Sequence, residues 1–225
     1  MNTPLKLQGR VESARLSDAV YETLLEAIIS GRLHAGAIVS EVSLAKQLEV
    51  SRTPVHDAMR QLAKDGLVEQ RAGRRAVITT FNRDDLYDIF EMRKLLEGEA
   101  AKRAANRIEH ASLASLRSVG ESLKNYSDSA EYIARWADFD EEFHESIAKA
   151  SGSPRLWQDI VRYRLLHRGF NKLATTVDGL QTALREHLQI LDALEKRDGN
   201  TASRLMVDHI QAWQTYFVNH MPTQA

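Results

Sequence analysis

The chain has 225 residues, of which 43% are hydrophobic and 27% charged, and its formal net charge is −1. This size and balance are typical of a soluble globular protein with one large domain or two small ones, and they argue against a uniformly basic nucleic-acid binder. The absence of cysteine excludes disulfides, thiolate metal sites and cysteine nucleophiles.

Apolar runs are short throughout the chain. None approaches the roughly 20 apolar residues of a membrane helix. The polar N-terminal stretch MNTPLKLQGRVESARLS lacks the apolar core of a secretory signal. The chain also has no cysteines and therefore no disulfides that would require an oxidising compartment. These features predict a cytoplasmic protein with no membrane partner.

The first 80 residues predict a small module of three helices and a hairpin. Apolar residues recur at helical spacing over 18–31, and Gly31 ends that helix. Ser40 is placed to cap a short helix, and a second helix begins near Ser51 with Pro54 in its first turn. Two short strands follow around residues 71–75, the second of them over 76–80. This order of elements is that of a winged helix-turn-helix.

From Asn82 onward the pattern is helical throughout. Breaks rich in glycine, serine and asparagine separate six segments, at about 83–106, 110–126, 130–150, 154–174, 178–197 and 200–219. The predicted fold class is therefore mostly α. A winged helix-turn-helix domain over 1–80 precedes an all-α antiparallel helical bundle over 81–225.

The second helix of a helix-turn-helix inserts its N-terminal residues into the major groove of DNA. An arginine there can bind guanine with two hydrogen bonds, and hydroxyls can bind phosphates. Arginines at the hairpin tip are suited to phosphate or minor-groove contact, although a solvated charged turn has the same composition. The candidate DNA-binding residues are Ser51, Arg52, Thr53, His56, Arg71, Arg74 and Arg75.

The segment SLAKQLEVSRTPVHDAMRQLAKDGLVE closely resembles the recognition signature of the GntR family of bacterial transcription regulators. That resemblance implies a regulator that binds double-stranded operator DNA as a homodimer. One departure stands out, because His56 and Asp57 occupy positions where the family usually has arginine and glutamate. A neutral imidazole cannot form the two hydrogen bonds of that arginine, so His56 is expected to change the preferred half-site.

Three histidines interrupt apolar stripes in the helical region. His144 follows Asp140 by one helical turn, His187 lies on a stripe of leucines, and His209 lies on a stripe with Trp213. A single histidine on such a face is usually a hydrogen-bonded core residue. Three of them with a carboxylate are costly to bury unpaired, and a divalent cation bound by Asp140, His144, His187 and His209 would satisfy all four.

The helical region resembles the FCD ligand-binding domain of the FadR-like branch of the GntR family, and its six helices suit the VanR-like subgroup. The resemblance implies the same four metal ligands, and it implies that Arg93 in EMRKLLEGEAAKRAA faces the cavity and binds a ligand carboxylate. Three imidazoles and one carboxylate suit zinc or nickel first, with iron or manganese as alternatives. Tyr163, Arg164 and His167 share one helix and are further effector-binding candidates, although a solvated face has the same pattern.

Together these features predict a metal-dependent, effector-responsive transcription regulator, a repressor that senses a small organic acid and is not an enzyme. Two alternatives have different consequences. A site of three histidines and an aspartate could activate water in a metal-dependent hydrolase, but that reading gives no role to the SRTPVHDA helix. A metal-free cavity could bind an acyl ligand, but such a pocket favours apolar residues where Asp140 and the histidines stand.

Overall fold

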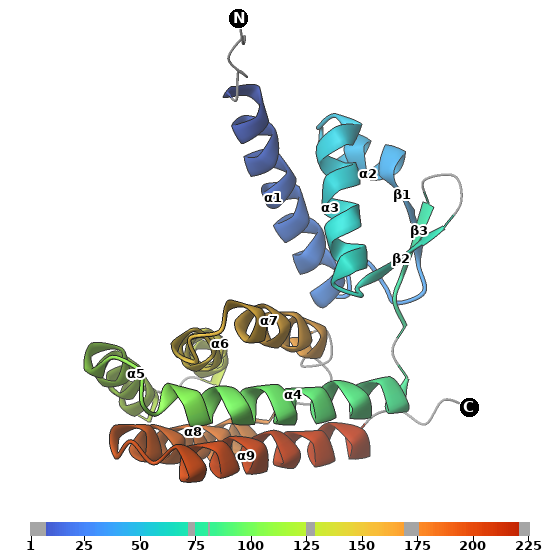
Figure 1. Cartoon of the computed structure of the whole chain (residues 1–225). Coiled ribbons are helices and arrows are strands. Elements are labelled where there is room, and N and C mark those ends of the chain that lie inside the picture. Colours follow the sequence, from blue (N-terminus) through green and yellow to red (C-terminus); the bar gives the residue numbers. More distant parts are fainter. Residues whose placement is uncertain (1–7, 72–74, 81, 125–128, 169–175, 221–225) are drawn as a thin grey trace, which may run out of the picture. The chain divides into compact units, whose positions relative to one another are not determined.

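The computed structural model describes residues 8–71, 75–80, 82–124, 129–168 and 176–220 (Figure 1). Within these ranges, the side chains of residues 8–14, 29, 129, 167, 168 and 220 are not described. The chain divides into two compact units, and the boundary in the sequence lies between Phe81 and Asn82. Each unit is treated separately below.

The first unit holds three helices and a small sheet. Its elements are α1 (Gln8–Ile29), β1 (Ile38–Ser40), α2 (Glu41–Gln47), α3 (Arg52–Lys64), β2 (Val68–Arg71) and β3 (Arg75–Ile78). The Ser40 side chain accepts a hydrogen bond from the Ser43 N–H and caps α2 as predicted. Helices α1 and α3 pack together through buried residues such as Leu24, Val55 and Leu62.

The three strands form one antiparallel sheet in the order β1-β3-β2. Sequence reasoning found β2 and β3 but missed β1, because a three-residue strand is too short to show a period of two. It also placed the start of the first helix ten residues too late, near residue 18 rather than at Gln8. With the sheet beside α2 and α3, the unit has the winged helix-turn-helix fold.

The second unit is all-helical among its described residues. Its helices are α4 (Arg83–Ala104), α5 (His110–Leu123), α6 (Ser129–Ala150), α7 (Pro154–Arg168), α8 (Val177–Glu195) and α9 (Gly199–His220). They match the six predicted segments, except that the predicted ends of the second and fourth, at 125–126 and 169–174, lie outside the described residues. The predicted fold class, mostly α with a winged helix-turn-helix before a helical bundle, is confirmed.

Helices α4 and α9 lie side by side along their length (Figure 1). Glycines permit this close approach. A Cβ at Gly199 would stand 2.6 Å from the carbonyl oxygen of Lys102, and one at Gly98 would stand 2.8 Å from Val207. At the other end, Gln214 of α9 donates to the Tyr87 carbonyl of α4. The pair therefore runs antiparallel and forms one wall of the unit.

The interior of the second unit is lined by the apolar faces of α4, α6, α8 and α9. The polar residues of the candidate site project from these same faces, so packing of the helices determines where they meet. None of the helices in the described ranges carries an apolar stretch sufficient to span a bilayer. The buried apolar side chains include Phe90, Leu116, Phe139, Phe143, Leu184, Leu191, Met206 and Ile210.

Candidate metal centre and nucleic-acid interface

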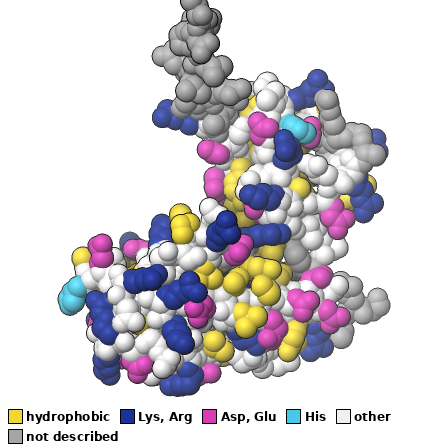
Figure 2. All heavy atoms as spheres, in the orientation of Figure 1, with side chains coloured by type: hydrophobic (Ala, Val, Ile, Leu, Met, Phe, Trp, Pro, Cys, Tyr) yellow, Lys and Arg dark blue, Asp and Glu magenta, His cyan; other side chains and the backbone are white. Residues whose placement is uncertain are grey.

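Three helices bring the predicted metal ligands together. Helix α6 supplies Asp140 and, one turn later, His144, while α8 supplies His187 and α9 supplies His209. One potential ligand atom from each residue lies within 4.8 Å of the corresponding atom of every other. All three histidines are buried, and Asp140 is partly buried. On the face of the molecule drawn in Figure 2, histidine side chains are visible only singly.

Three of the six separations between these ligand atoms are close to those around a single ion. The Nε2 atoms of His187 and His209 lie 3.2 Å apart. Asp140 Oδ1 lies 3.6 Å from Nε2 of His144 and 3.6 Å from Nε2 of His187. Atoms about 2.1 Å from a metal lie about 3.0 Å apart at an octahedral edge and about 3.4 Å apart at a tetrahedral edge. The residues therefore fit a divalent cation at their centre.

Two carboxylates orient the imidazoles of His144 and His209 through hydrogen bonds at Nδ1, the ring nitrogen that is not a proposed ligand atom. Nδ1–H of His209 donates to Oε2 of Glu186 over 2.7 Å, and Nδ1–H of His144 donates to Oε2 of Glu97. Each carboxylate fixes the proton on Nδ1 and leaves Nε2 as a lone-pair donor to a cation. Metal-binding histidines in proteins are commonly held by carboxylates in this way.

The buried polar atoms of the cluster are incompletely satisfied by protein alone. Among the described residues, His144 Nε2 and His187 Nδ1 have no hydrogen-bond partner. His187 stacks on Phe143, with ring centroids 4.2 Å apart, and packs against Trp136. Because an unpaired buried polar atom is costly, the unpaired Nε2 of His144 supports the interpretation that the cluster binds a cation.

The electrostatics of the cluster favour the protonation states that a cation needs. Burial opposes ionisation of Asp140, but the Arg164 guanidinium and His144 outweigh it and hold the pKa of Asp140 well below its usual range. Burial, assisted by His209, holds the pKa of His187 well below its ordinary value. Burial likewise lowers the pKa of His209, against the opposing hydrogen bond to Glu186. A carboxylate and the neutral imidazoles of His187 and His209 thus face one another.

The two predicted effector-binding arginines are both buried, and each has a carboxylate partner. Nη2 of Arg164 donates to Asp140 Oδ2 over 2.9 Å and to Glu141 Oε2 over 3.2 Å, while its Nε has no described partner. Nε of Arg93 donates to Glu97 Oε1 over 2.7 Å. Arg164 therefore contacts the cluster directly, whereas Arg93 is joined to it through Glu97.

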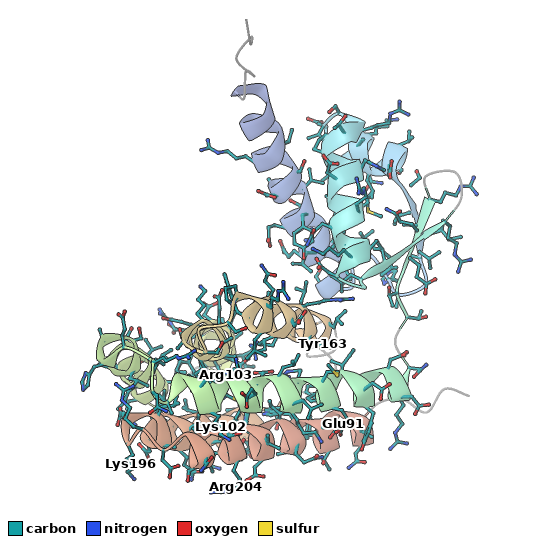
Figure 3. All side chains as sticks on the ribbon, in the orientation of Figure 1. Glu91, Lys102, Arg103, Tyr163, Lys196 and Arg204 are labelled. Atoms are coloured by element: carbon teal, nitrogen blue, oxygen red, sulfur yellow. The ribbon has the colours of Figure 1, made fainter. Side chains whose placement is uncertain are left out.

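The other two effector candidates are not part of the described cluster. Tyr163 lies on α7 (Figure 3) and is half-buried, and no described contact joins it to the four candidate ligands. The side chain of His167 lies outside the described residues. These two assignments therefore stay predictions.

Sequence reasoning missed the supporting carboxylates Glu97 and Glu186. For Glu97 a signal was present, because Arg93 and Glu97 together interrupt the apolar stripe that Leu86, Phe90 and Ala101 make along α4. Glu186 gave no such signal, since it is partly exposed beside His187. That it meets His209 depends on how α8 packs against α9.

The first unit presents the predicted DNA-contacting side chains at its surface. Ser51, Arg52, Thr53 and His56 are all exposed at the start of α3. Arg71 and Arg75 are exposed and stand opposite each other in the register of β2 and β3, and Arg74 lies outside the described residues. An additional contact was not predicted: Glu41 of α2 bonds to His56.

A winged helix-turn-helix unit followed by a separate helical unit is the arrangement of a DNA-binding transcription regulator with a second domain. Residues 16–78 match the family model of bacterial regulatory proteins of the gntR family, and residues 88–212 match the model of the FCD domain. The chain belongs to the GntR family of transcription regulators and carries an FCD domain, which confirms the resemblance found in its sequence.

Curated relatives cover nearly all of the chain. It is 28% identical over 204 residues to a probable D-xylose utilization operon transcriptional repressor of Paenarthrobacter nicotinovorans, covering 91% of this chain and 89% of that protein. It is 25% identical over 203 residues to the transcriptional repressor RspR of Escherichia coli, covering 87% and 86%. These relatives are regulators, and the chain is a transcription regulator rather than the hydrolase considered as an alternative.

Solved structures share the fold. Escherichia coli McbR/YncC aligns with a TM-score of 0.75 at 20% identity, covering 91% of this chain and 97% of that one. A GntR regulator from Rhodococcus aligns with a TM-score of 0.68 at 20% identity, covering 92% and 99%. At this level of identity the likeness extends to the fold alone.

Replacing Arg52 with alanine is expected to weaken specific operator binding by about 1–3 kcal/mol, because an arginine at the start of a recognition helix can bind a base edge or phosphate directly. The measurement is a fluorescence anisotropy titration of operator DNA at fixed salt. Arg204→Ala, which removes an exposed arginine of α9, is the control and should leave the affinity unchanged. Equal affinities of wild type and Arg52→Ala would contradict the placement of α3 in the groove.

Proposed function

We propose that this regulator is a metal-dependent repressor that binds operator DNA as a homodimer and releases or strengthens that binding when a small organic acid reaches its metal centre. The cluster of Asp140, His144, His187 and His209 is the observation on which the proposal depends. The names of the relatives from Paenarthrobacter and Escherichia coli support repression. The homodimer is expected because a palindromic operator presents two half-sites to two recognition helices.

The proposed metal ligands are the four residues of the cluster. Zinc or nickel suits three imidazoles and a carboxylate best, and iron or manganese suits them as alternatives. Four protein ligands would complete a tetrahedral site, and in an octahedral site they would leave two positions open. A bound cation would supply an electrophilic centre for an anionic ligand, and the residues around it would decide which ligand fits.

The two buried arginines, Arg164 and Arg93, are proposed to have different roles in binding an acid. Nε–H of Arg164 is a buried donor with no described partner, and the same guanidinium contacts Asp140. A ligand carboxylate beside the cation could accept from that Nε–H. Arg93 is already paired with Glu97, so we assign it a supporting role unless ligand binding separates the pair. Tyr163 and His167 are proposed as further contacts on α7.

An effector regulates only if its affinity differs between the two states of the protein. The ligands of the proposed centre come from α6, α8 and α9, and Glu97 connects it to α4. An acid bound at the cation would therefore stabilise one arrangement of these four helices over another. A coupling of a few kcal/mol would change operator occupancy by roughly a hundredfold.

The experiment that tests this function is elemental analysis of the untagged protein by inductively coupled plasma mass spectrometry, paired with native mass spectrometry against a panel of small organic acids. We expect roughly one divalent ion per chain and a mass shift with at least one carboxylate ligand. The mass shift should be lost in Arg164→Ala and retained in Arg155→Ala, which changes an exposed arginine of the same helix. Protein that stays metal-free after reconstitution would contradict the proposal.

The stability of the metal-free protein is expected to fall as the pH decreases below the ordinary imidazole value of about 6.5. The lowered pKa values of His187 and His209 keep both rings neutral in the native state. On acidification the unfolded chain therefore takes up protons first, so the stability that these groups contribute is complete above that value and is lost below it. The Tm of the protein in excess chelator, at about pH 7.5 and about pH 5.5, measures this loss. Equal Tm values at the two pH values would contradict the burial of His187 and His209 as neutral rings.

A further inference from the structure

A buried glutamate holds the exposed histidine of the recognition helix. Glu41 begins α2 directly after the Ser40 cap, and its side chain is only 8% exposed. Its Oε1 lies 2.8 Å from Nδ1 of His56. The His56 side chain itself is 48% exposed. One edge of the imidazole is therefore fixed against α2, and the other remains accessible from solvent.

This contact determines which hydrogen bonds His56 can offer. A carboxylate only accepts, so Nδ1 of His56 must carry the proton that it donates to Glu41. A neutral imidazole has one N–H group and one lone-pair nitrogen. With the proton on Nδ1, Nε2 is a pure acceptor, and it lies on the side of the ring away from Nδ1.

The placement of His56 on α3 directs that acceptor toward bases. His56 lies one turn after Arg52, and both are exposed, whereas Val55 and Met59 between and beyond them are buried. In a helix-turn-helix, the N-terminal part of the second helix contacts the edges of bases in the major groove. The exposed face of α3 is therefore the reading face, and His56 is on it.

We propose that Glu41 is a positioning residue that makes His56 an acceptor-only reader, so that His56 selects a base with an amino group in the major groove. Adenine N6 and cytosine N4 present such donors, whereas guanine presents only the acceptors O6 and N7. Guanine at this position would face the Nε2 lone pair and be disfavoured. The inference rests on the operator binding of the proposed function and is independent of the metal centre.

The test is a selection of binding sites from a random-sequence DNA library at about pH 8, where imidazole side chains are ordinarily neutral. Wild type, His56→Ala, His56→Arg, Glu41→Gln and Glu22→Gln are compared at the same salt. Glu41→Gln keeps the shape of the side chain, but its amide can donate to Nδ1 as well as accept from it, so the proton of His56 is no longer confined to Nδ1. Glu22→Gln makes the same change of charge at an exposed position of α1 and controls for general electrostatics.

We expect wild type and Glu22→Gln to select adenine or cytosine at one position of each half-site, about threefold to tenfold over guanine, the range of one hydrogen bond. His56→Ala should lose that preference, His56→Arg should select guanine there, and Glu41→Gln should accept guanine. All five proteins should agree at the remaining positions.

The outcomes distinguish failure of this inference from failure of the proposed operator binding. If wild type enriches no sequence, both operator recognition and the inference fail. Suppose that wild type enriches a site and that His56→Ala or Glu41→Gln selects the same bases at every position of that site. Operator binding then stands, and the inference is overturned. The inference would also be overturned if wild type preferred guanine at the position where His56→Ala loses its base preference.

Discussion

Replacing His187 with alanine is expected to abolish tight binding of the divalent ion and the thermal stabilisation that it provides. His187 is fully buried, and its Nε2 lies 3.2 Å from that of His209, so no other side chain can take its place without repacking. A ligand at a thousand times its dissociation constant stabilises a protein by about 4 kcal/mol. For a chain of this size that corresponds to a shift in Tm of about 8–16 °C. The measurement is the difference in Tm with added metal and with chelator.

Taking this difference within each variant separates metal binding from packing. Loss of the His187 ring also leaves space beside Phe143 and Trp136, and that cost is present with and without metal. We expect the difference between metal and chelator to vanish in His187→Ala and to persist in His110→Ala, which removes an exposed histidine at the start of α5. An unchanged metal stoichiometry in His187→Ala would remove this residue from the ligand set.

Much of the fold could be predicted from local sequence, because several helices of the second unit carry their own boundary signals. Asn82 caps α4 through a capping box with Asp85, and Gly152 ends the turn after α6 with a positive φ of 72°. These signals act within a few residues and need no partner. Strand β1 differs, because Ile38–Ser40 becomes a strand only by pairing with β3.

The candidate site divides in the same way. The four proposed ligands could be identified because three histidines interrupt apolar stripes, which show which residues face the interior, and because Asp140 lies one helical turn before His144. The partners of those ligands could not be identified, because a stripe does not show how neighbouring helices are aligned along their axes. Glu97 meets His144 only through the packing of α4 against α6, and Glu41 meets His56 only through the packing of α2 against α3.

The partner with the greatest predicted importance is Glu97, which serves two buried groups at once. One carboxylate oxygen accepts from Nε of Arg93 over 2.7 Å, and the other accepts from Nδ1 of His144. The side chains of Arg93 and Glu97 are each only 3% exposed. Burial alone would raise the pKa of Glu97, but Arg93 and His144 outweigh it and hold that pKa below its usual range. The carboxylate thus stays charged where it is needed for both contacts.

Replacing Glu97 with alanine is therefore expected to destabilise the protein by about 3–5 kcal/mol, because it leaves the Arg93 guanidinium buried without a counter-charge. The Tm should fall by about 6–20 °C. Metal affinity should fall by about tenfold to a hundredfold as well, because His144 loses the acceptor that fixes its tautomer and orientation. Differential scanning calorimetry measures the first effect, and chelator competition measures the second.

The same helix contains a matched control. Glu99 and Arg103 form an ion pair with the same 2.7 Å separation and the same one-turn spacing, but both side chains are 45% exposed. Glu99→Ala should cost at most about 1 kcal/mol and leave metal affinity unchanged. The double variant Arg93→Leu with Glu97→Leu should recover much of the lost stability, because neither charge remains, and still bind metal weakly, because His144 remains unsupported. If the double variant also bound metal as tightly as wild type, Glu97 would be an ion-pair partner of Arg93 alone, with no part in holding the metal centre.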